Sequence, residues 1–105
     1  MRYEIILAPT AAKALRALGA RRRAEVEDAL ETHLRHEPGK VSKSRIKRLR
    51  GMSRPQYRLR VGDIRVFYDV TATGVQVLAI ITKADAAAWL QTEGVADESS
   101  RAGEG

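Results

Sequence analysis

Apolar residues near the start of the chain follow first a strand pattern and then a helical one. Residues 3–7 form a short run with β-branched side chains and an aromatic residue, which predicts a strand. After this run, Pro9 and Thr10 suit the start of a helix, with Thr10 as its N-cap. The apolar residues that follow have helical spacing and stop at Gly19, a residue type that commonly ends helices. A strand and a helix are therefore expected before Gly19.

A second helix is predicted over residues 21–36. Val26, Leu30 and Leu34 recur every four residues, and acidic side chains fill the positions between them. Such a helix has one apolar and one charged face. Pro38 pushes the residue before it out of the helical region, so the helix ends there. The two helices are expected to form an antiparallel hairpin that packs on a sheet.

The second half of the chain predicts an antiparallel meander. Strands are expected over residues 46–50, 57–61, 64–70 and 75–81, with a loop over 51–55 and a two-residue turn at Gly62 and Asp63. Along 57–61, apolar residues alternate with Arg58 and Arg60, which places both arginines on one face of the sheet. Residues 83–93 are compatible with a short alanine-rich helix.

These elements define a small α+β fold in a single domain: an N-terminal strand, a two-helix antiparallel hairpin and then the meander. A chain of 105 residues suits one domain. We assign this domain to residues 1–91. Residues 92–105 contain four acidic residues and one basic residue among small polar ones, so we expect an acidic, disordered tail there.

Composition excludes several functional classes. The chain has no cysteine, which rules out disulfides, zinc fingers, iron–sulfur sites and thiol nucleophiles and fits a cytoplasmic location. The longest apolar runs have five residues, so neither a membrane span nor a signal peptide is expected. No nucleotide-binding glycine motif or metal motif is present. We expect no cofactor and no metal.

Basic residues are concentrated in one part of the chain. The formal net charge is +6, from 19 Lys and Arg against 13 Asp and Glu. Between residues 40 and 65 ten basic residues are opposed only by Asp63, and three aromatic residues lie in or beside this segment. A solvated charged surface would explain an ordinary run of charges. A segment of nearly one sign with aromatic residues favours a site for a polyanion.

The same segment resembles a known family. Residues 47–52 (KRLRGM) and 57–70 (YRLRVGDIRVFYDV) are similar to the core signature of the RelE/ParE toxin superfamily, and the resemblance extends over roughly residues 3–91. It implies the RelE/ParE-like, microbial ribonuclease-like fold and a toxin of a bacterial type II toxin–antitoxin pair. RelE-like members cut mRNA on the ribosome, whereas ParE-like members poison DNA gyrase. Both are neutralised by a small acidic antitoxin, which is RelB-like for the first group.

The resemblance and the alternation together give the candidate site residues. Guanidinium groups suit phosphate oxygens, and Arg65 follows the tight turn and lies across from Arg58 and Arg60. The candidate catalytic residues are Arg58, Arg60, Arg65 and Lys83. The candidate RNA-binding residues are Lys43, Lys47, Arg48, Arg50, Arg54 and Tyr68. For Tyr68, a role as a core aromatic with its hydroxyl at the edge is an equally open alternative.

Several positions depart from the family pattern and leave the proton-transfer groups open. Arg58 and Arg60 stand where RelE-like enzymes often have lysines. Ala84 and Leu90 stand where an arginine and a base-stacking tyrosine are usual. Arginine stays protonated, so it is a poor general base. Lys83, next to other cations, is one candidate base, and Asp69 and Asp85 are weaker ones.

Three interpretations of function remain open at this stage. We favour a metal-independent endoribonuclease that cleaves mRNA on the ribosome and inhibits translation. A ParE-like toxin that inhibits gyrase without cutting nucleic acid is the first alternative, and an inactive RNA-binding relative is the second. His33 and His36 are read as residues of a helix surface, and Trp89 as a packing anchor more often than a stacking platform.

Overall fold

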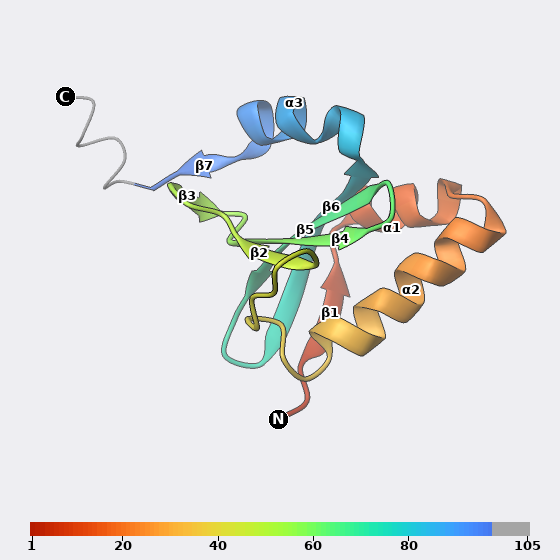
Figure 1. Cartoon of the computed structure of the whole chain (residues 1–105), viewed down its shortest axis with the longest axis horizontal. Coiled ribbons are helices and arrows are strands. Elements are labelled where there is room, and N and C mark those ends of the chain that lie inside the picture. Colours follow the sequence, from red (N-terminus) through yellow and green to blue (C-terminus); the bar gives the residue numbers. More distant parts are fainter. Residues whose placement is uncertain (98–105) are drawn as a thin grey trace.

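A computed structural model describes residues 1–97 of the chain, and Figure 1 shows the arrangement of its elements. The elements in chain order are β1 (Glu4–Leu7), α1 (Pro9–Ala17), α2 (Ala20–Leu34), β2 (Ile46–Arg48), β3 (Met52–Arg54), β4 (Tyr57–Val61), β5 (Ile64–Val70), β6 (Gly74–Thr82), α3 (Lys83–Glu93) and β7 (Val95–Ala96). Five strands form one sheet in the order β1-β6-β5-β4-β2, and β3 pairs with β7 separately. Only β1 and β6 are parallel within the described sheets. The expected α+β fold is confirmed.

The sheet has different neighbours on its two faces. The α1–α2 hairpin packs on one face, and α3 lies over the other (Figure 1). The core lies between the helix hairpin and the sheet, because the apolar stripe of α2 meets the inward-facing strand residues there. Its buried members include Val26, Leu30, Leu34, Leu59, Ile64, Val66, Val75, Val77 and Ile80. The predicted helix hairpin and the alternation in β4 are therefore confirmed.

Helix ends differ from the prediction at the start of α1, at Gly19 and at the end of α2, which stops at Leu34 and not at residue 36. Helix α1 begins at Pro9 with Ala8 as its N-cap, so Thr10 lies inside the first turn and does not cap it. Gly19 does not end α1 in a left-handed conformation. Its φ of −59° is ordinary, and it serves as the N-cap of α2. The glycine was correctly placed between the helices, but it belongs to the second helix.

The β4–β5 turn forms where the sequence predicts it. Gly62 has a φ of +58°, a backbone conformation that favours glycine. The two strands pair so that Arg60 is opposite Arg65 and Leu59 is opposite Val66. The turn therefore fixes which side chains share a face.

Tyr68 lies in the core, which corrects its assignment as an RNA-binding residue. Its side chain is 0% exposed and points to the face that the helix hairpin covers. Its ring stacks on Tyr57, and its hydroxyl donates a 2.7 Å hydrogen bond to the carbonyl of Pro38. Tyr68 thus ties the segment after α2 to the sheet.

The C-terminal region contains more structure than the sequence indicated. Helix α3 spans Lys83–Glu93, which confirms the helix expected there, and β7 pairs with β3 across the segment that was expected to be a loop. Residues 92 and 93 thus lie in α3, and residues 95 and 96 lie in β7, within the segment for which the sequence predicted a disordered tail. The signal was weak because these strands are only two and three residues long. Residues 98–105 of the predicted tail lie outside the described residues.

We predict that Tyr68→Phe destabilises the fold by about 1 kcal/mol at pH 7, because the Pro38 carbonyl loses its hydrogen bond. Burial, followed by the nearby Tyr57, raises the pKa of Tyr68 above its ordinary value of 10.0. The folded state therefore favours the protonated hydroxyl, and this contribution is complete below pH 10 and lost as the pH rises further. Urea unfolding at pH 7 and pH 11 should show a smaller alkaline loss in the variant. An equal loss in both proteins would contradict this account.

Candidate nucleic-acid interface

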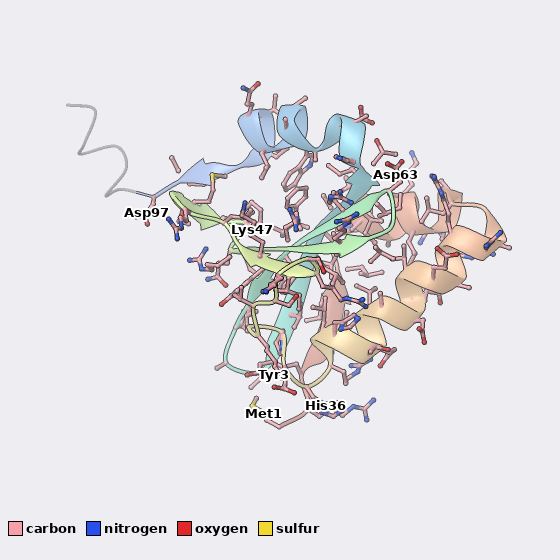
Figure 2. The ribbon with its side chains drawn as sticks, in the orientation of Figure 1. Met1, Tyr3, His36, Lys47, Asp63 and Asp97 are labelled. Atoms are coloured by element: carbon pink, nitrogen blue, oxygen red, sulfur yellow. The ribbon has the colours of Figure 1, made fainter. Side chains whose placement is uncertain are left out.

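The face of the sheet under α3 carries a cluster of arginines. Arg58 and Arg60 alternate with the core residues of β4, and Arg65 is directly opposite Arg60 on β5. We call Arg58, Arg60 and Arg65, together with Lys47, the arginine face. Lys47 is the cross-strand partner of Arg58 on β2, and Figure 2 labels it together with Asp63 at the tip of the β4–β5 hairpin. Period-2 alternation and strand register thus bring together residues from three strands.

Arg65 is largely buried and holds the hairpin turn. It is 7% exposed, and its Nη1 donates hydrogen bonds to the carbonyls of Gly62 (2.8 Å) and Ile64 (3.1 Å). From the other side, the backbone N–H of Lys83 donates a 2.8 Å bond to the carbonyl of Asp63. The turn is therefore fixed by Arg65 and by the start of α3. These contacts give Arg65 a positioning role at the edge of the arginine face.

Arg58 has a polar atom that lacks a partner. Its Nε is buried and has no hydrogen-bond acceptor. Desolvation and the positive charges of Arg65 and Arg60 lower the pKa of Arg58. Within residues 1–97, no carboxylate forms an ion pair with any of these three arginines. Buried donors are normally satisfied, so this arrangement suits an anion that supplies acceptor oxygens.

The structure divides the other predicted RNA-binding residues into two groups. Lys47 and Arg50 border a hollow of about 640 Å³ beside Leu90 of α3, close to the arginine face. Arg48 pairs with Tyr57 on the opposite face and lies 5.3 Å from the centre of that ring. Arg48 also donates to two backbone carbonyls. It is therefore separated from the arginine face.

Arg54 lines a hollow of about 490 Å³ together with Trp89 of α3 and Ala79 of β6. Arg54 forms an ion pair with Asp69 at 3.6 Å, and Asp69 also accepts a hydrogen bond from the backbone N–H of Gln56. Lys43 is exposed in the segment before β2.

Asp85 accepts a hydrogen bond from the hydroxyl of Thr82 in the first turn of α3. Both candidate carboxylate bases are thus engaged in local contacts.

Phe67 is a member of this face that sequence reasoning did not single out. It is directly opposite Arg58 and is 1% exposed, because Trp89 of α3 stacks on it with ring centroids 5.1 Å apart and an interplanar angle of 10°. Trp89 packs on the sheet, in line with the packing role given to it. A signal for Phe67 was available, since it lies two residues after Arg65 in the same strand and so shares its face.

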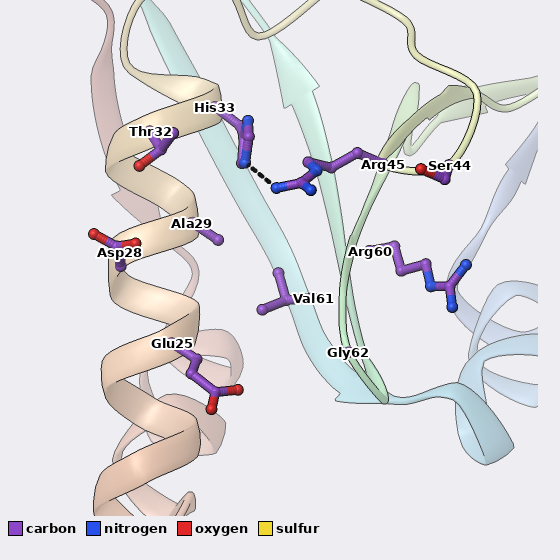
Figure 3. Close-up of a pocket in the computed structure, with 10 residues that line it drawn as sticks. All are labelled: Glu25, Asp28, Ala29, Thr32, His33, Ser44, Arg45, Arg60, Val61 and Gly62. Carbon is purple, nitrogen blue, oxygen red and sulfur yellow. Dashed lines mark hydrogen bonds between the residues drawn. The ribbon is translucent and has the colours of Figure 1, made fainter.

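His33 belongs to a separate groove between α2 and the strands. The groove has a volume of about 590 Å³ and carries Glu25 and Asp28 on the α2 side (Figure 3). Its opposite wall includes Arg45, whose Nη1 donates a 2.8 Å hydrogen bond to Nε2 of His33. Figure 3 also shows that the Arg60 side chain points away from α2. Among residues 1–97, no group of three or more His, Cys, Asp or Glu side chains could hold a metal ion.

Comparisons with known proteins agree with this fold. The family described as "ParE toxin of type II toxin-antitoxin system, parDE" matches residues 5–87. The chain therefore belongs to the RelE/ParE superfamily of type II toxins. No curated protein sequence matches the chain, and within residues 1–97 no helix is long and apolar enough to cross a membrane.

Solved structures point to the same superfamily. The RelBE2 toxin–antitoxin complex of Mycobacterium tuberculosis contains a chain that is 26% identical, with a TM-score of 0.64 and coverage of 79% of this chain and 100% of that one. The RelE–RelB complex of Pyrococcus horikoshii contains one that is 30% identical, with a TM-score of 0.57 and coverage of 79% and 97%. The YoeB dimer of Staphylococcus aureus shares the fold, with 15% identity, a TM-score of 0.59 and coverage of 77% and 97%.

We predict that Arg58→Met stabilises the unliganded protein by about 1 kcal/mol, because it removes an unsatisfied buried donor and two repulsive contacts. Thermal unfolding at low ionic strength tests this expectation. Added sulfate should raise the unfolding temperature of the original protein more than that of the variant. A variant that is less stable, with an equal response to sulfate, would show that Arg58 is a structural residue.

We also predict that His33 titrates below its ordinary pKa. Burial, followed by the charge of Arg45, lowers the pKa of His33 from 6.5, and Asp28 opposes this shift. The neutral ring is favoured in the folded state, so its contribution to stability is present above pH 6.5 and is lost as the pH falls. Arg45→Gln should raise the midpoint in an NMR titration of the ring protons. An unchanged midpoint would mean that burial alone determines the shift.

Proposed function

We propose that this toxin is a metal-independent endoribonuclease that cleaves mRNA on the ribosome and so inhibits translation. The observation that supports the proposal is the unsatisfied Nε of Arg58 within three arginines that have no carboxylate partner in residues 1–97. An RNA phosphate supplies acceptor oxygens and negative charge at that position. The relationship to RelE chains at 26% and 30% identity adds support.

The proposed reaction uses the ribose hydroxyl of the RNA as its nucleophile. The 2′-oxygen attacks the adjacent phosphorus, and the bond to the 5′-oxygen of the next nucleotide breaks. The products are a 2′,3′-cyclic phosphate and a 5′-hydroxyl, so the proton lost by the nucleophile is balanced by the proton gained by the leaving oxygen. Arg58 and Arg60 would hold the phosphate and stabilise the charge of its five-coordinate state. Arg65 would keep the hairpin in place.

Groups other than the arginines must transfer protons, because arginine side chains remain protonated. Lys83 is exposed at the first position of α3, beside the hairpin turn that Arg65 holds. Its amine is our candidate for exchanging a proton with one of the two oxygens. The ribosome would hold the RNA with its 2′-oxygen and phosphorus correctly oriented. Such orientation of the reacting atoms is itself a large part of catalysis.

We further propose that an acidic, RelB-like antitoxin neutralises the chain. The relatives from M. tuberculosis and P. horikoshii are found as toxin–antitoxin complexes. The net charge of +6 favours an acidic partner, as does an arginine face whose arginines have no carboxylate partner among residues 1–97. Covering this face would prevent RNA from reaching Arg58.

Inhibition of DNA gyrase is the second candidate function, and two observations favour it. The matching family is described as ParE, and Ala84 and Leu90 replace an arginine and a tyrosine usual in RelE-like enzymes. Such a toxin would use the same basic face to bind without cutting nucleic acid. The two functions therefore differ in whether new RNA ends appear.

Primer extension on an mRNA in a reconstituted translation reaction tests the ribonuclease. We expect new 5′ ends at fixed positions within codons, and a fall of about a hundredfold in their rate of appearance with Arg58→Met. Arg21→Met is the matched control, because it removes the same charge from a side chain on α2 that is 94% exposed. Cleavage by this control should remain unchanged.

A negative result would be equally informative. If the folded protein stops cell growth but produces no new RNA ends, the ribonuclease proposal is wrong. Supercoiling by purified gyrase would then be measured with the same three proteins. Inhibition by the original protein and the Arg21→Met control would support the ParE-like function.

A further inference from the structure

Phe67 occupies the middle of the arginine face but is hidden from solvent. It is opposite Arg58 on β4 and opposite Ala79 on β6, and it lies two residues from Arg65 along β5. Its 1% exposure results from the near-parallel ring of Trp89. Aromatic rings set among cations on a sheet are a recurrent means of binding unpaired nucleobases. Here a side chain of the protein itself covers such a ring.

We propose that Phe67 is a stacking platform for a nucleobase and that Trp89 takes the place of that base when no RNA is bound. An indole and a nucleobase are both flat conjugated rings, so either can cover the same face of Phe67. The inference rests on the proposed function, because Arg58 beside Phe67 would hold a phosphate of the same strand. Binding of RNA would then exchange one stacked ring for another.

The attachment of α3 is compatible with this exchange. None of its residues is fully buried. At its start, the N–H of Lys83 bonds to the hairpin turn, and at its end β7 pairs with β3 over a few residues. Trp89 stacks on Phe67 between these two attachments. Moving Trp89 off Phe67 therefore breaks the ring contact and loosens both the packing of α3 on β5 and β6 and the short β3–β7 pairing, while the core under the helix hairpin stays intact.

The return of the chain from α3 to β7 is sterically tight at Gly94. A Cβ at this position would lie 2.3 Å from Cε of Met52 and 2.4 Å from the carbonyl oxygen of Leu90. The contact with the Leu90 backbone cannot be relieved by a flexible side chain. Gly94→Ala should therefore loosen the β3–β7 pairing and the hold on Trp89 without changing either stacked ring. It provides a test variant that keeps both aromatic residues.

Equilibrium binding of two oligonucleotides at low salt tests the platform. One is a 2′-O-methyl RNA, which lacks the attacking hydroxyl, and the other has the same length and charge but abasic residues. Trp89→Ala should bind the base-containing strand about fivefold or more tightly, since a competing ring is gone. Gly94→Ala should change affinity in the same direction. Phe67→Leu should weaken binding of that strand, and all three variants should bind the abasic strand as the original protein does.

The single tryptophan of the chain gives a second measurement. When a base displaces the indole, the emission of Trp89 should shift to longer wavelength as the ring enters water. The abasic strand should leave the emission in place. Circular dichroism shows whether each variant keeps the fold. If Trp89→Ala does not fold, Gly94→Ala still tests the proposal.

The outcomes separate this inference from the proposed function. Equal affinity for both strands, with Trp89→Ala binding no more tightly, would leave the phosphate site intact and reject the platform. Weaker binding of the base-containing strand by Trp89→Ala would also reject it, because the base would then stack on Trp89. If the original protein binds neither strand, the nucleic-acid site fails, and the platform fails with it.

Discussion

The pairing of β4 with β5 is the constraint on which the rest of the molecule depends. Leu59 is opposite Val66, and Arg60 is opposite Arg65. Because successive side chains point to opposite faces, one register buries the apolar pair and gathers the arginines on the other face. A slip by one residue would put arginines into the core. The apolar layer therefore fixes the position of charges that repel each other.

This arrangement couples stability to function. The repulsion among the arginines and the unsatisfied Nε of Arg58 oppose folding, while burial on the other face supports it. Functional sites commonly keep such unfavourable contacts, because a ligand relieves them. Arg65 is a partial exception, since its guanidinium already bonds to the carbonyls of the hairpin turn. The unsatisfied hydrogen-bonding capacity is therefore centred on Arg58.

Local patterns in the sequence predicted most of the fold. The four-residue spacing of Val26, Leu30 and Leu34 and the alternation along β4 depend on near neighbours, and both were confirmed. The pairing of β3 with β7 was missed, since it joins very short strands distant in the sequence. The same limit applies to Trp89, whose contact with Phe67 depends on how α3 returns over the sheet.

The candidate site was predictable where the alternation of side chains between the two faces of a strand determined which residues lie together. Arg58, Arg60 and Lys47 share a face because alternation and register place them there. The same alternation places Tyr68 on the core face. Its aromatic ring, which could stack on a base, and its position beside the basic segment suggested RNA binding instead. For Arg48 and Arg54, sequence could not show the partners that engage them, namely backbone carbonyls and Asp69.

The parallel pairing of β1 with β6 has a consequence for how the protein is made. It joins Glu4 to Gly74, and β5 gains its second neighbour only when β6 arrives. Contacts between such distant positions form late, because the intervening chain must first be synthesised and ordered. During translation, β1 therefore cannot take its place in the sheet until β6 has been synthesised. The five-stranded sheet is complete only after β6 emerges, although its other four strands all precede β6 in the chain.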